Sequence, residues 1–432
     1  MKSMPLASQA SQSDPFYVDS AQFQLTQGKH NQGELSQEDL SQEDLSQEDL
    51  SQHKAVRYCR ELMRRPSITP EDAGCQQWLG ERLVAMGFDV SHYQDKGVSN
   101  LLASFDERPA QLALAGHTDV VPPGDLSRWQ TPPFAATLVD GMLIGRGAVD
   151  MKSGLAVMLA AVEDHIACYG LPKANWQFIV TSDEEGEAEH GTRTLVERLK
   201  AQSRLPKYCV VAEPTADKQA GDVIKIGRRG AISARLTLKG KQGHVAYPKN
   251  AVNALHMAAR VMQALEALIW DEGSDDFPGT SLQVTHVDSG AFTDNIVPGS
   301  CEICFNIRYS YRYSEAGIMA RIQACLDGLS LGEDAISLRW ERGCQPYHTQ
   351  ENDEQSLIAQ VEAAIFEVTA SFPRLSTSGG TSDGRFLSSP QTQVIELGLP
   401  NRTIHQVNER VELAQIVRLY RIYRALLTRF HD

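Results

Sequence analysis

The chain has 432 residues, of which 42% are hydrophobic, and a formal net charge of −14 at pH 7. This length is sufficient for two domains that each bury a sizeable core. The acidic balance argues against a nucleic-acid partner, which requires basic surfaces. No apolar stretch approaches the roughly 18 residues that cross a bilayer, so we also expect no membrane partner.

The cysteine content and the N-terminal composition indicate in which cellular compartment the protein is located. Eight cysteines scattered over the chain do not form a disulfide framework. Residues 1–29 lack the compact apolar core of a signal peptide. We therefore expect a cytoplasmic protein.

The N-terminal segment differs in composition from the rest of the chain. Residues 36–50 are three tandem copies of Ser-Gln-Glu-Asp-Leu. Leucines that recur every five residues spiral around a helix axis and make no apolar stripe. Low hydrophobicity with high net charge is typical of disorder, so residues 1–53 are expected to be a disordered acidic tail. The tail is interpreted as solvated and without a catalytic part; a partner-binding segment is the alternative.

Strand and helix patterns alternate after the tail. The spacing of Val56, Cys59, Leu62 and Met63 predicts a first amphipathic helix. Alternation of strands and helices is typical of a doubly wound α/β domain. The predicted strands cover 101–105, 111–115, 176–181 and 208–212, and the helices cover 153–169 and 192–201.

The pattern changes near residue 231, where A-I-S-A-R-L-T-L-K alternates like a half-exposed antiparallel strand. A β-α-β-β-α-β order follows, which predicts a ferredoxin-like α+β unit. We therefore expect an α/β protein with a catalytic domain of residues 54–229 and 344–432 and an inserted domain of residues 230–343. The elements of the insert are 231–239, 251–268, 281–288, 301–309, 315–326 and 335–341, and the α/β pattern resumes with 355–369, 392–397 and 413–429.

Three apolar runs of the first domain end on residues that can bind a metal ion. The run L-A-L-A-G-H ends on His117, a second run is followed by Glu184 and Glu185, and a third by Glu213. In open α/β sheets, ligand sites lie at the carboxyl ends of the strands. The three runs therefore predict one metal site on one edge of the sheet.

Further segments add candidates. Asp150 lies in a glycine-flanked loop before a helix, and His405 follows a later strand. Asp119 is placed to orient the imidazole of His117. Neighbouring side chains in extended chain point in opposite directions, so one of the two adjacent glutamates can hold metal while the other faces the reacting water. Each residue alone has an ordinary alternative, such as a helix cap or a solvated charge; several strand-end coincidences on one edge favour the metal site.

The motifs that carry these residues resemble those of a known family. H-T-D-V-V-P-P-G, G-R-G-A-V-D-M-K, T-S-D-E-E-G and A-E-P-T are similar to motifs of the two-zinc amidohydrolases and exopeptidases of the acetylornithine deacetylase and succinyl-diaminopimelate desuccinylase family. The resemblance covers residues 54–432. The segments G-R-R-G, G-K-Q-G-H-V-A-Y-P, S-G-G-T-S-D-G-R-F and T-I-H-Q-V-N-E resemble the desuccinylase branch more closely.

The resemblance implies a zinc-exopeptidase-like catalytic domain and an inserted domain that serves as lid and dimerisation unit. It implies that Asp150 bridges two zinc ions, that His117 and Glu213 complete one site, and that Glu185 and His405 complete the other. Histidine and carboxylate ligands without thiolate fit a catalytic zinc pair, with Co²⁺ as an alternative metal. A cis peptide is implied after the bridging aspartate.

The resemblance also implies catalytic and substrate-binding roles. Glu184 corresponds to the general acid/base and Asp119 to the residue that orients His117. His244 corresponds to a histidine that reaches the site of the other subunit, so a homodimer is expected. The residues expected to contact the substrate are Arg228, Arg229, Asn295, Arg308, Thr381, Ser382, Arg385 and Asn401.

The activity implied is removal of succinate from N-succinyl-L,L-2,6-diaminopimelate in lysine biosynthesis. An acetylornithine deacetylase, aminoacylase or dipeptidase with the same metals is the alternative. The arginine-rich segments favour the substrate with three carboxylates, because guanidinium pairs with carboxylate. A metal-free binding protein on a degenerate fold is a third interpretation, and the presence of Glu184 with all five ligand candidates argues against it.

Two features test the limits of the resemblance. Arg402 stands where the family usually has a small residue, which adds a charge beside Asn401. Cys301 and Cys304 form a C-x-x-C pattern on a predicted strand. Residues three apart on a strand face opposite sides, so we expect no metal role for this pair.

Overall fold

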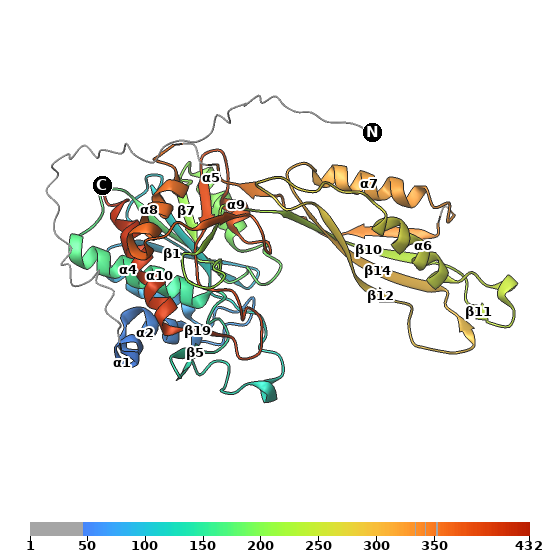
Figure 1. Ribbon diagram of the computed structural model, residues 1–432, viewed down its shortest axis with the longest axis horizontal. Helices are drawn as coiled ribbons and strands as arrows, with labels where there is room; N and C mark the ends of the chain where they lie inside the picture. Colours follow the sequence, from blue (N-terminus) through green and yellow to red (C-terminus); the bar gives the residue numbers. More distant parts are fainter. Residues whose placement is uncertain (1–45, 333, 342, 351–352) are drawn as a thin grey trace, which may run out of the picture. The chain divides into compact units, whose positions relative to one another are not determined.

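The computed structural model describes residues 46–332, 334–341, 343–350 and 353–432 (Figure 1). Most of the expected acidic tail, residues 1–45, lies outside the described residues. The last repeat forms helix α1 (Gln47–Gln52), in which Ser46 and Asp49 make a capping box. Leu50 packs against the main core. The expected disorder up to residue 53 is therefore wrong at its C-terminal end, where α1 is capped and also packs against helices of the catalytic domain.

The main sheet has eight strands in the order β1-β2-β6-β3-β7-β18-β8-β17. β3, β6, β7 and β18 run parallel in its middle, as expected for short apolar runs that are buried on both faces. The antiparallel strand β1 has no fully buried residue, which explains why its sequence shows no apolar run. The bounds are β1 (Asp89–Asp95), β2 (Val98–Ser104), β3 (Leu112–His117), β6 (Trp176–Thr181), β7 (Tyr208–Val211), β8 (Val223–Lys225), β17 (Arg374–Ser376) and β18 (Gln393–Glu396).

The direction of winding reverses at β3. The chain crosses from β3 through α4 to β6 on one side, and then from β6 through α5 to β7 on the other side of β3. Since crossovers between parallel strands are right-handed, α4 and α5 cover opposite faces of the sheet. α4 packs against α2 and α10, and α10 packs against α8 (Figure 1). The bounds are α2 (Lys54–Met63), α4 (Lys152–Tyr169), α5 (Thr192–Ala201), α8 (Leu357–Thr369) and α10 (Leu413–Thr428).

Several shorter elements complete this part of the chain. β19, β5 and β4 form a separate three-stranded sheet beside the main one, and β9 pairs with β16. The bounds are α3 (Cys75–Ala85), β4 (Thr137–Val139), β5 (Met142–Ile144), β9 (Gly227–Arg228), β16 (Tyr347–His348), α9 (Gly384–Leu387) and β19 (Arg410–Glu412).

The inserted unit is an antiparallel sheet in the order β12-β14-β10-β15 with helices α6 and α7. Its element order is the predicted β-α-β-β-α-β, and the ferredoxin-like arrangement is confirmed. Cys301 is buried and Cys304 is half-buried on alternate sides of β14, as predicted. The bounds are β10 (Gly230–Lys239), β11 (Gly243–His244), α6 (Ala254–Glu266), β12 (Ser281–Asp288), β13 (Ile296–Val297), β14 (Ser300–Tyr309), α7 (Glu315–Asp327) and β15 (Ile336–Trp340).

Two hydrophobic cores lie in the described chain. The larger one takes buried residues between Ala55 and Ile226 and again between Tyr347 and Phe430, and the smaller one lies between Ile232 and Leu326. The cores support the predicted domain boundaries at 229/230 and 343/344, which remain a prediction. Among the described residues, none of the helices combines the length and apolarity that a membrane span requires.

Candidate metal centre

The candidate centre lies where three parallel strands end. β3 is flanked by β6 and β7, and His117 is its last residue. Glu184 and Glu185 follow β6, and Glu213 follows β7. Because the strands are parallel neighbours, these side chains reach one edge of the sheet, at the point where the winding reverses. The predicted convergence on this edge is confirmed.

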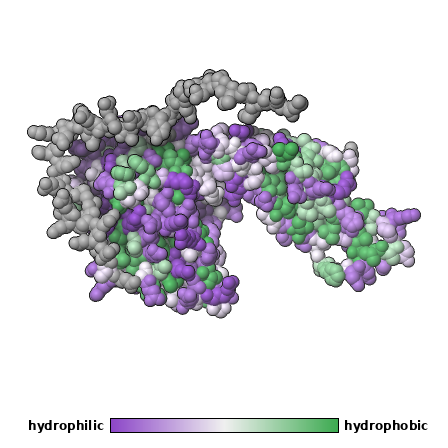
Figure 2. All heavy atoms as spheres, in the orientation of Figure 1, coloured by the Kyte–Doolittle hydropathy of each residue, from purple (hydrophilic) through white to green (hydrophobic). Residues whose placement is uncertain are grey.

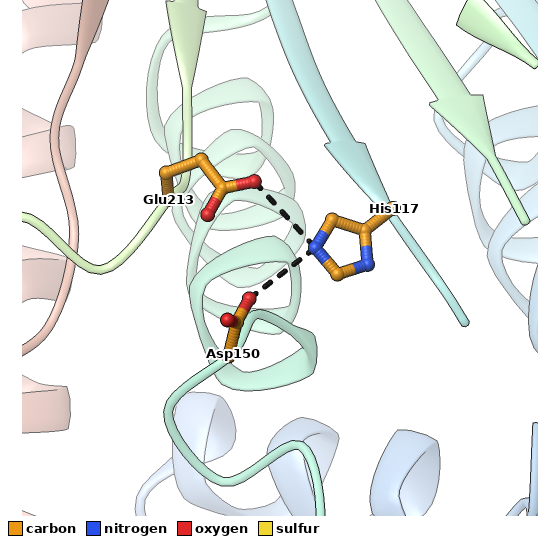
Figure 3. A group of neighbouring side chains, drawn as sticks. All are labelled: His117, Asp150 and Glu213. Atoms are coloured by element: carbon orange, nitrogen blue, oxygen red, sulfur yellow. Dashed lines mark ion pairs between the residues drawn. The ribbon is translucent and has the colours of Figure 1, made fainter. Parts of the chain in front are cut away.

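The first group consists of His117, Asp150 and Glu213 (Figure 3). Nε2 of His117 lies 3.3 Å from Oδ1 of Asp150 and 3.5 Å from Oε1 of Glu213. Within the described chain these three buried atoms have no hydrogen-bond partner. Buried polar atoms are nearly always satisfied, so three unsatisfied atoms that face one another fit a bound cation.

The second group consists of Asp150, Glu185 and His405. Nε2 of His405 lies 3.0 Å from Oε1 of Glu185 and 3.3 Å from Oδ2 of Asp150. Asp150 thus presents one carboxylate oxygen to each group, which is the arrangement of a bridging ligand. The Asp150–Met151 peptide is cis, as the resemblance implied.

Asp119 organises the first group from behind. Nδ1 of His117 lies 2.9 Å from the main-chain oxygen of Asp119 and 3.5 Å from its Oδ1. A proton on Nδ1 leaves the lone pair of Nε2 directed at the other ligands. The Asp119 carboxylate also accepts the backbone N–H groups of Glu184 and Glu185, so one residue fixes both β3 and the segment after β6.

Glu184 lies beside the first group. Its Oε2 lies 3.8 Å from Nε2 of His117, and its side chain is only 14% exposed. Burial, followed by the negative charge of Glu213, raises the pKa of Glu184 well above its usual value. A carboxyl group with a raised pKa can both take up and release a proton near neutral pH.

The acidic surroundings favour cations at this edge. Hydrogen bonds to Asp150 and Glu185 raise the pKa of His405 to about 10. Burial opposes a charge on His117, but the neighbouring carboxylates of Asp119, Asp150 and Glu213 outweigh this effect and raise the pKa of His117 well above its usual value. Protons therefore compete with a metal ion for both histidines.

Metal uptake is therefore expected to release protons. The raised pKa values of both histidines favour protons on the atoms that would bind a cation, so metal binding should displace protons. The apparent zinc affinity should rise as the pH is raised from 6 toward 8. Isothermal titration calorimetry in buffers of different ionisation enthalpy measures the released protons; zinc uptake without proton release would contradict this assignment.

The expected substrate residues fall into separate places. Arg308, Thr381 and Arg385 line one cavity of about 270 Å³, together with Asn306. Nη1 of Arg308 and Nε of Arg385 are buried without a hydrogen-bond partner among the described residues. Two half-buried guanidinium groups, each with one buried donor that lacks a partner in the described chain, fit carboxylates of a ligand.

Arg228 and Ser382 are held by a buried carboxylate that the sequence analysis did not identify. Nε of Arg228 lies 2.9 Å from Oε1 of Glu396, its Nη2 also donates to Glu396, and Nη1 donates to the main-chain oxygen of Ser378 at 2.9 Å. The Ser382 hydroxyl also donates to Glu396. In this structure the donors of Arg228 are directed inward, and its expected substrate contact stays a prediction.

The remaining candidates lie elsewhere. Nη1 of Arg229 donates to the main-chain oxygen of Gly279, and the backbone N–H of Asn401 donates to Ala216. His244 is exposed on β11, next to the strand that Asn295 precedes: the N–H of Val245 donates to the oxygen of Asn295. His244 belongs to neither ligand group. Arg402 donates from Nε to the main-chain oxygen of Asp217.

Two further carboxylates at the centre were missed. Asp383 lines a small cavity with Glu184 and Glu213, and burial raises the pKa of Asp383 to about 6. Glu409 accepts the backbone N–H of Asp150. Both residues stand in motifs quoted for the resemblance, but a short motif gives no indication of which of its acids is buried.

The fold and the two ligand groups fit a metal-binding hydrolase with an inserted α+β domain. The chain belongs to the peptidase family M20/M25/M40, whose model matches residues 113–429. The resemblance identified in the sequence is therefore confirmed.

Individual relatives agree with this assignment. The chain is 46% identical over 376 residues to succinyl-diaminopimelate desuccinylase 1 of Alteromonas mediterranea, covering 87% of this chain and 96% of that protein. It is 44% identical to succinyl-diaminopimelate desuccinylase of Methylobacillus flagellatus, with 87% and 98% covered. The M20 family metallo-carboxypeptidase Sso-CP2 of Sulfolobus solfataricus has the same fold, with a TM-score of 0.74 at 15% identity over 87% of this chain and 98% of that one.

Proposed function

We propose that this protein hydrolyses N-succinyl-L,L-2,6-diaminopimelate to succinate and L,L-2,6-diaminopimelate, a step of lysine biosynthesis. The observation that carries the proposal is 46% identity to a desuccinylase over 96% of its length. The cavity with Arg308 and Arg385 supports it, because the substrate has three carboxylates and guanidinium groups bind carboxylates.

Two zinc ions are the proposed cofactors, with Co²⁺ as an alternative. His117, Asp150 and Glu213 would hold one ion, and Asp150, Glu185 and His405 the other. Nitrogen and carboxylate ligands without thiolate fit catalytic zinc. When bound, the ions supply a nucleophilic hydroxide at neutral pH and polarise the amide carbonyl.

Glu184 is the proposed general base and acid. It takes a proton from the attacking water as the oxygen–carbon bond forms at the succinyl carbonyl. The same carboxyl group then gives the proton to the amide nitrogen as the carbon–nitrogen bond breaks. Succinate and the free amine leave, and Glu184 is ionised again. The small separation between Glu184 and His117 supports this role.

A substrate panel tests the proposal directly. Turnover of N-succinyl-L,L-2,6-diaminopimelate and of acetylornithine is compared with the zinc-loaded enzyme. Preference for the succinyl substrate supports the proposal. Preference for acetylornithine, or for an acylated amino acid or dipeptide, leaves the metal chemistry in place and assigns the second candidate function. Turnover of none of these contradicts both.

The arginine cavity gives a second test. Arg385→Gln and Arg308→Gln should each lower kcat/KM for the succinyl substrate by roughly 10–100-fold, mostly through KM, since a hydrogen bond to a charged group contributes about 1.5–3 kcal/mol. Zinc content should not change. Arg193→Gln is the control, because Arg193 pairs with Glu197 on the surface of α5. Unchanged KM in both cavity variants would remove these residues from the substrate site.

A homodimer through the inserted domain is also proposed. In Figure 2, hydrophobic residues gather on the visible face of the inserted unit. Large exposed apolar patches are typical of protein interfaces. Exposed apolar side chains of this unit include Val245, Tyr247, Val252, Leu255, Phe292 and Ile296, and Ile296 pairs directly with His244.

Complementation tests whether His244 acts in the site of the other subunit. Glu184→Gln and His244→Ala are each expected to be nearly inactive. Mixed after dissociation and reassociation, they should regain activity, because a mixed dimer contains one site with an intact Glu184 and an intact His244 from the partner. If His244 serves its own subunit, every site lacks one of the two groups and mixing restores nothing.

A cytoplasmic location is proposed for the enzyme. All eight cysteines lie in the described chain and are free. Free thiols persist in reducing compartments, whereas secreted proteins tend to form disulfides. The proposed reaction acts on a small biosynthetic intermediate, which agrees with this location.

A further inference from the structure

One buried carboxylate accepts most of the backbone N–H groups of the loop that carries Asp150, the proposed bridging ligand. Glu409 is 0% exposed. Its Oε1 accepts the backbone N–H groups of Val149 and Asp150 at 2.7 and 3.0 Å. Its Oε2 accepts the N–H of Gly147 at 2.9 Å and Nη1 of Arg146 at 2.7 Å. These N–H groups belong to irregular backbone before α4, so a side chain has to provide the acceptor that a sheet or helix would otherwise supply.

Arg146 extends the same network to the segment that carries the other ligand. Its side chain is 2% exposed. Nη1 donates to the main-chain oxygen of Gln406 at 3.3 Å, and Nη2 lies 3.5 Å from that of His405. Nη2 also donates to the oxygen of Pro122, in the loop after β3. The guanidinium group thus connects three segments, each of which carries a candidate metal ligand.

The backbone at these ligands needs such support. His405 has a φ of 59° and Asn408 a φ of 61°, which lie in the left-handed region that residues with a Cβ rarely adopt. Gly147, with a φ of 81°, is the glycine that this loop requires. Conformations of this kind persist where surrounding contacts fix them, and they cluster at functional sites.

The buried ion pair of Arg146 and Glu409 is poorly explained by a contribution to folding stability alone. Burying two charges has a desolvation cost that their attraction often only balances, and well-packed apolar residues usually stabilise a core as well or better. A fixed acceptor and a planar donor, in contrast, hold several backbone segments in one geometry. The Arg146–Glu409 pair is located where Asp150 and His405 must keep a spacing suited to metal ions.

We propose that Arg146 and Glu409 are positioning residues of the metal centre: Glu409 fixes the backbone of Asp150, and Arg146 fixes the backbone of His405. The inference rests on the proposed dizinc function and assigns two residues beyond its ligands. Partners outside the ligand shell typically change metal affinity by about 10–100-fold. Replacing Glu409 should affect both metal sites, because Asp150 belongs to both ligand groups. Replacing Arg146 should affect one site, because His405 belongs to one group.

Zinc binding to the metal-free full-length protein tests the pair. Equilibrium dialysis over graded free zinc, followed by metal analysis, gives the affinity of each site for wild type, Arg146→Lys and Glu409→Gln. Arg146→Lys keeps the charge but lacks the planar fork of the guanidinium group. The site that contains His405 should therefore lose about 10–100-fold in zinc affinity, while the affinity of the other site is retained. His405→Ala provides the reference for loss of the second site. Glu409→Gln should weaken both sites, because its amide nitrogen cannot accept the N–H groups of the loop.

Glu412→Gln is the matched control, because Glu412 is exposed on β19, three residues after Glu409. This variant should bind two ions like wild type. Two ions bound with wild-type affinity by Arg146→Lys and Glu409→Gln would overturn the proposal, even if their thermal stability fell, since that is the result of a purely structural role. If Glu409→Gln shows no cooperative unfolding, Arg146→Lys alone decides. A wild-type protein that binds no zinc would overturn the proposed function itself and this inference with it.

Discussion

Replacement of Glu184 by glutamine is expected to lower kcat by about 10²–10⁴-fold, the range typical of a lost general acid/base. Glutamine preserves the size of the side chain but can neither accept the proton of water nor deliver one to the leaving nitrogen. Glu184 belongs to neither ligand group, so both ions should remain bound. Single-turnover rates of succinate release and zinc content, measured on the same preparation, test this expectation.

Glu197→Gln makes the same chemical change on the exposed face of α5 and should leave the rate unchanged. A Glu184→Gln enzyme that turns over at the wild-type rate would exclude the proton-transfer role. Loss of zinc in step with loss of rate would instead make Glu184 a ligand.

Replacement of Asp150 by asparagine is expected to disturb both ions at once. Its two oxygens lie 3.3 Å from Nε2 of His117 and 3.3 Å from Nε2 of His405. Asparagine keeps one oxygen and turns an amide N–H₂ donor toward the other group, where a cation would lie. Zinc content should fall below two ions per chain, and the affinity should fall by more than the about 10–100-fold of an outer-shell change. Metal analysis after dialysis against graded free zinc measures the effect.

Activity should fall with zinc content in this variant, and excess zinc should restore only part of it. Asp89→Asn, at an exposed position of β1, controls for the loss of one negative charge. Retention of two tightly bound ions by Asp150→Asn would show that Asp150 is no bridging ligand.

The sequence predicted the central part of this site because strand ends can be read from local pattern. An apolar run that stops on His117 or before Glu213 predicts a strand and places the polar residue close to its end. Parallel pairing then brings the ends of neighbouring strands to one edge. The signal for His405 is weaker, since it lies several residues after its strand in an irregular loop with a left-handed backbone, and the family motif was needed to support it.

The sequence could not predict which polar side chains of the site are buried and which face the substrate cavity. Arg228 and Ser382 lie in motifs that are typical of substrate contacts, yet both donate to Glu396. Glu396 and Glu409 are fully buried, but each looks in sequence like an ordinary acid at the end or start of a strand. Whether a polar side chain points into the pocket or behind it is decided by tertiary packing, to which a single sequence gives little access.

The order of the ligands along the chain has a consequence for synthesis. The first group is complete once Glu213 has been made, whereas the second requires His405, which follows the entire inserted unit. β18 pairs in the middle of the main sheet between β7 and β8, so the sheet cannot be completed before the last part of the chain has been made. Domains of a nascent protein generally fold as units as they leave the ribosome. The inserted unit can therefore fold outside the ribosome before His405 has been made. A chain that can bind both proposed ions, and so hydrolyse an amide, exists only when translation is nearly finished.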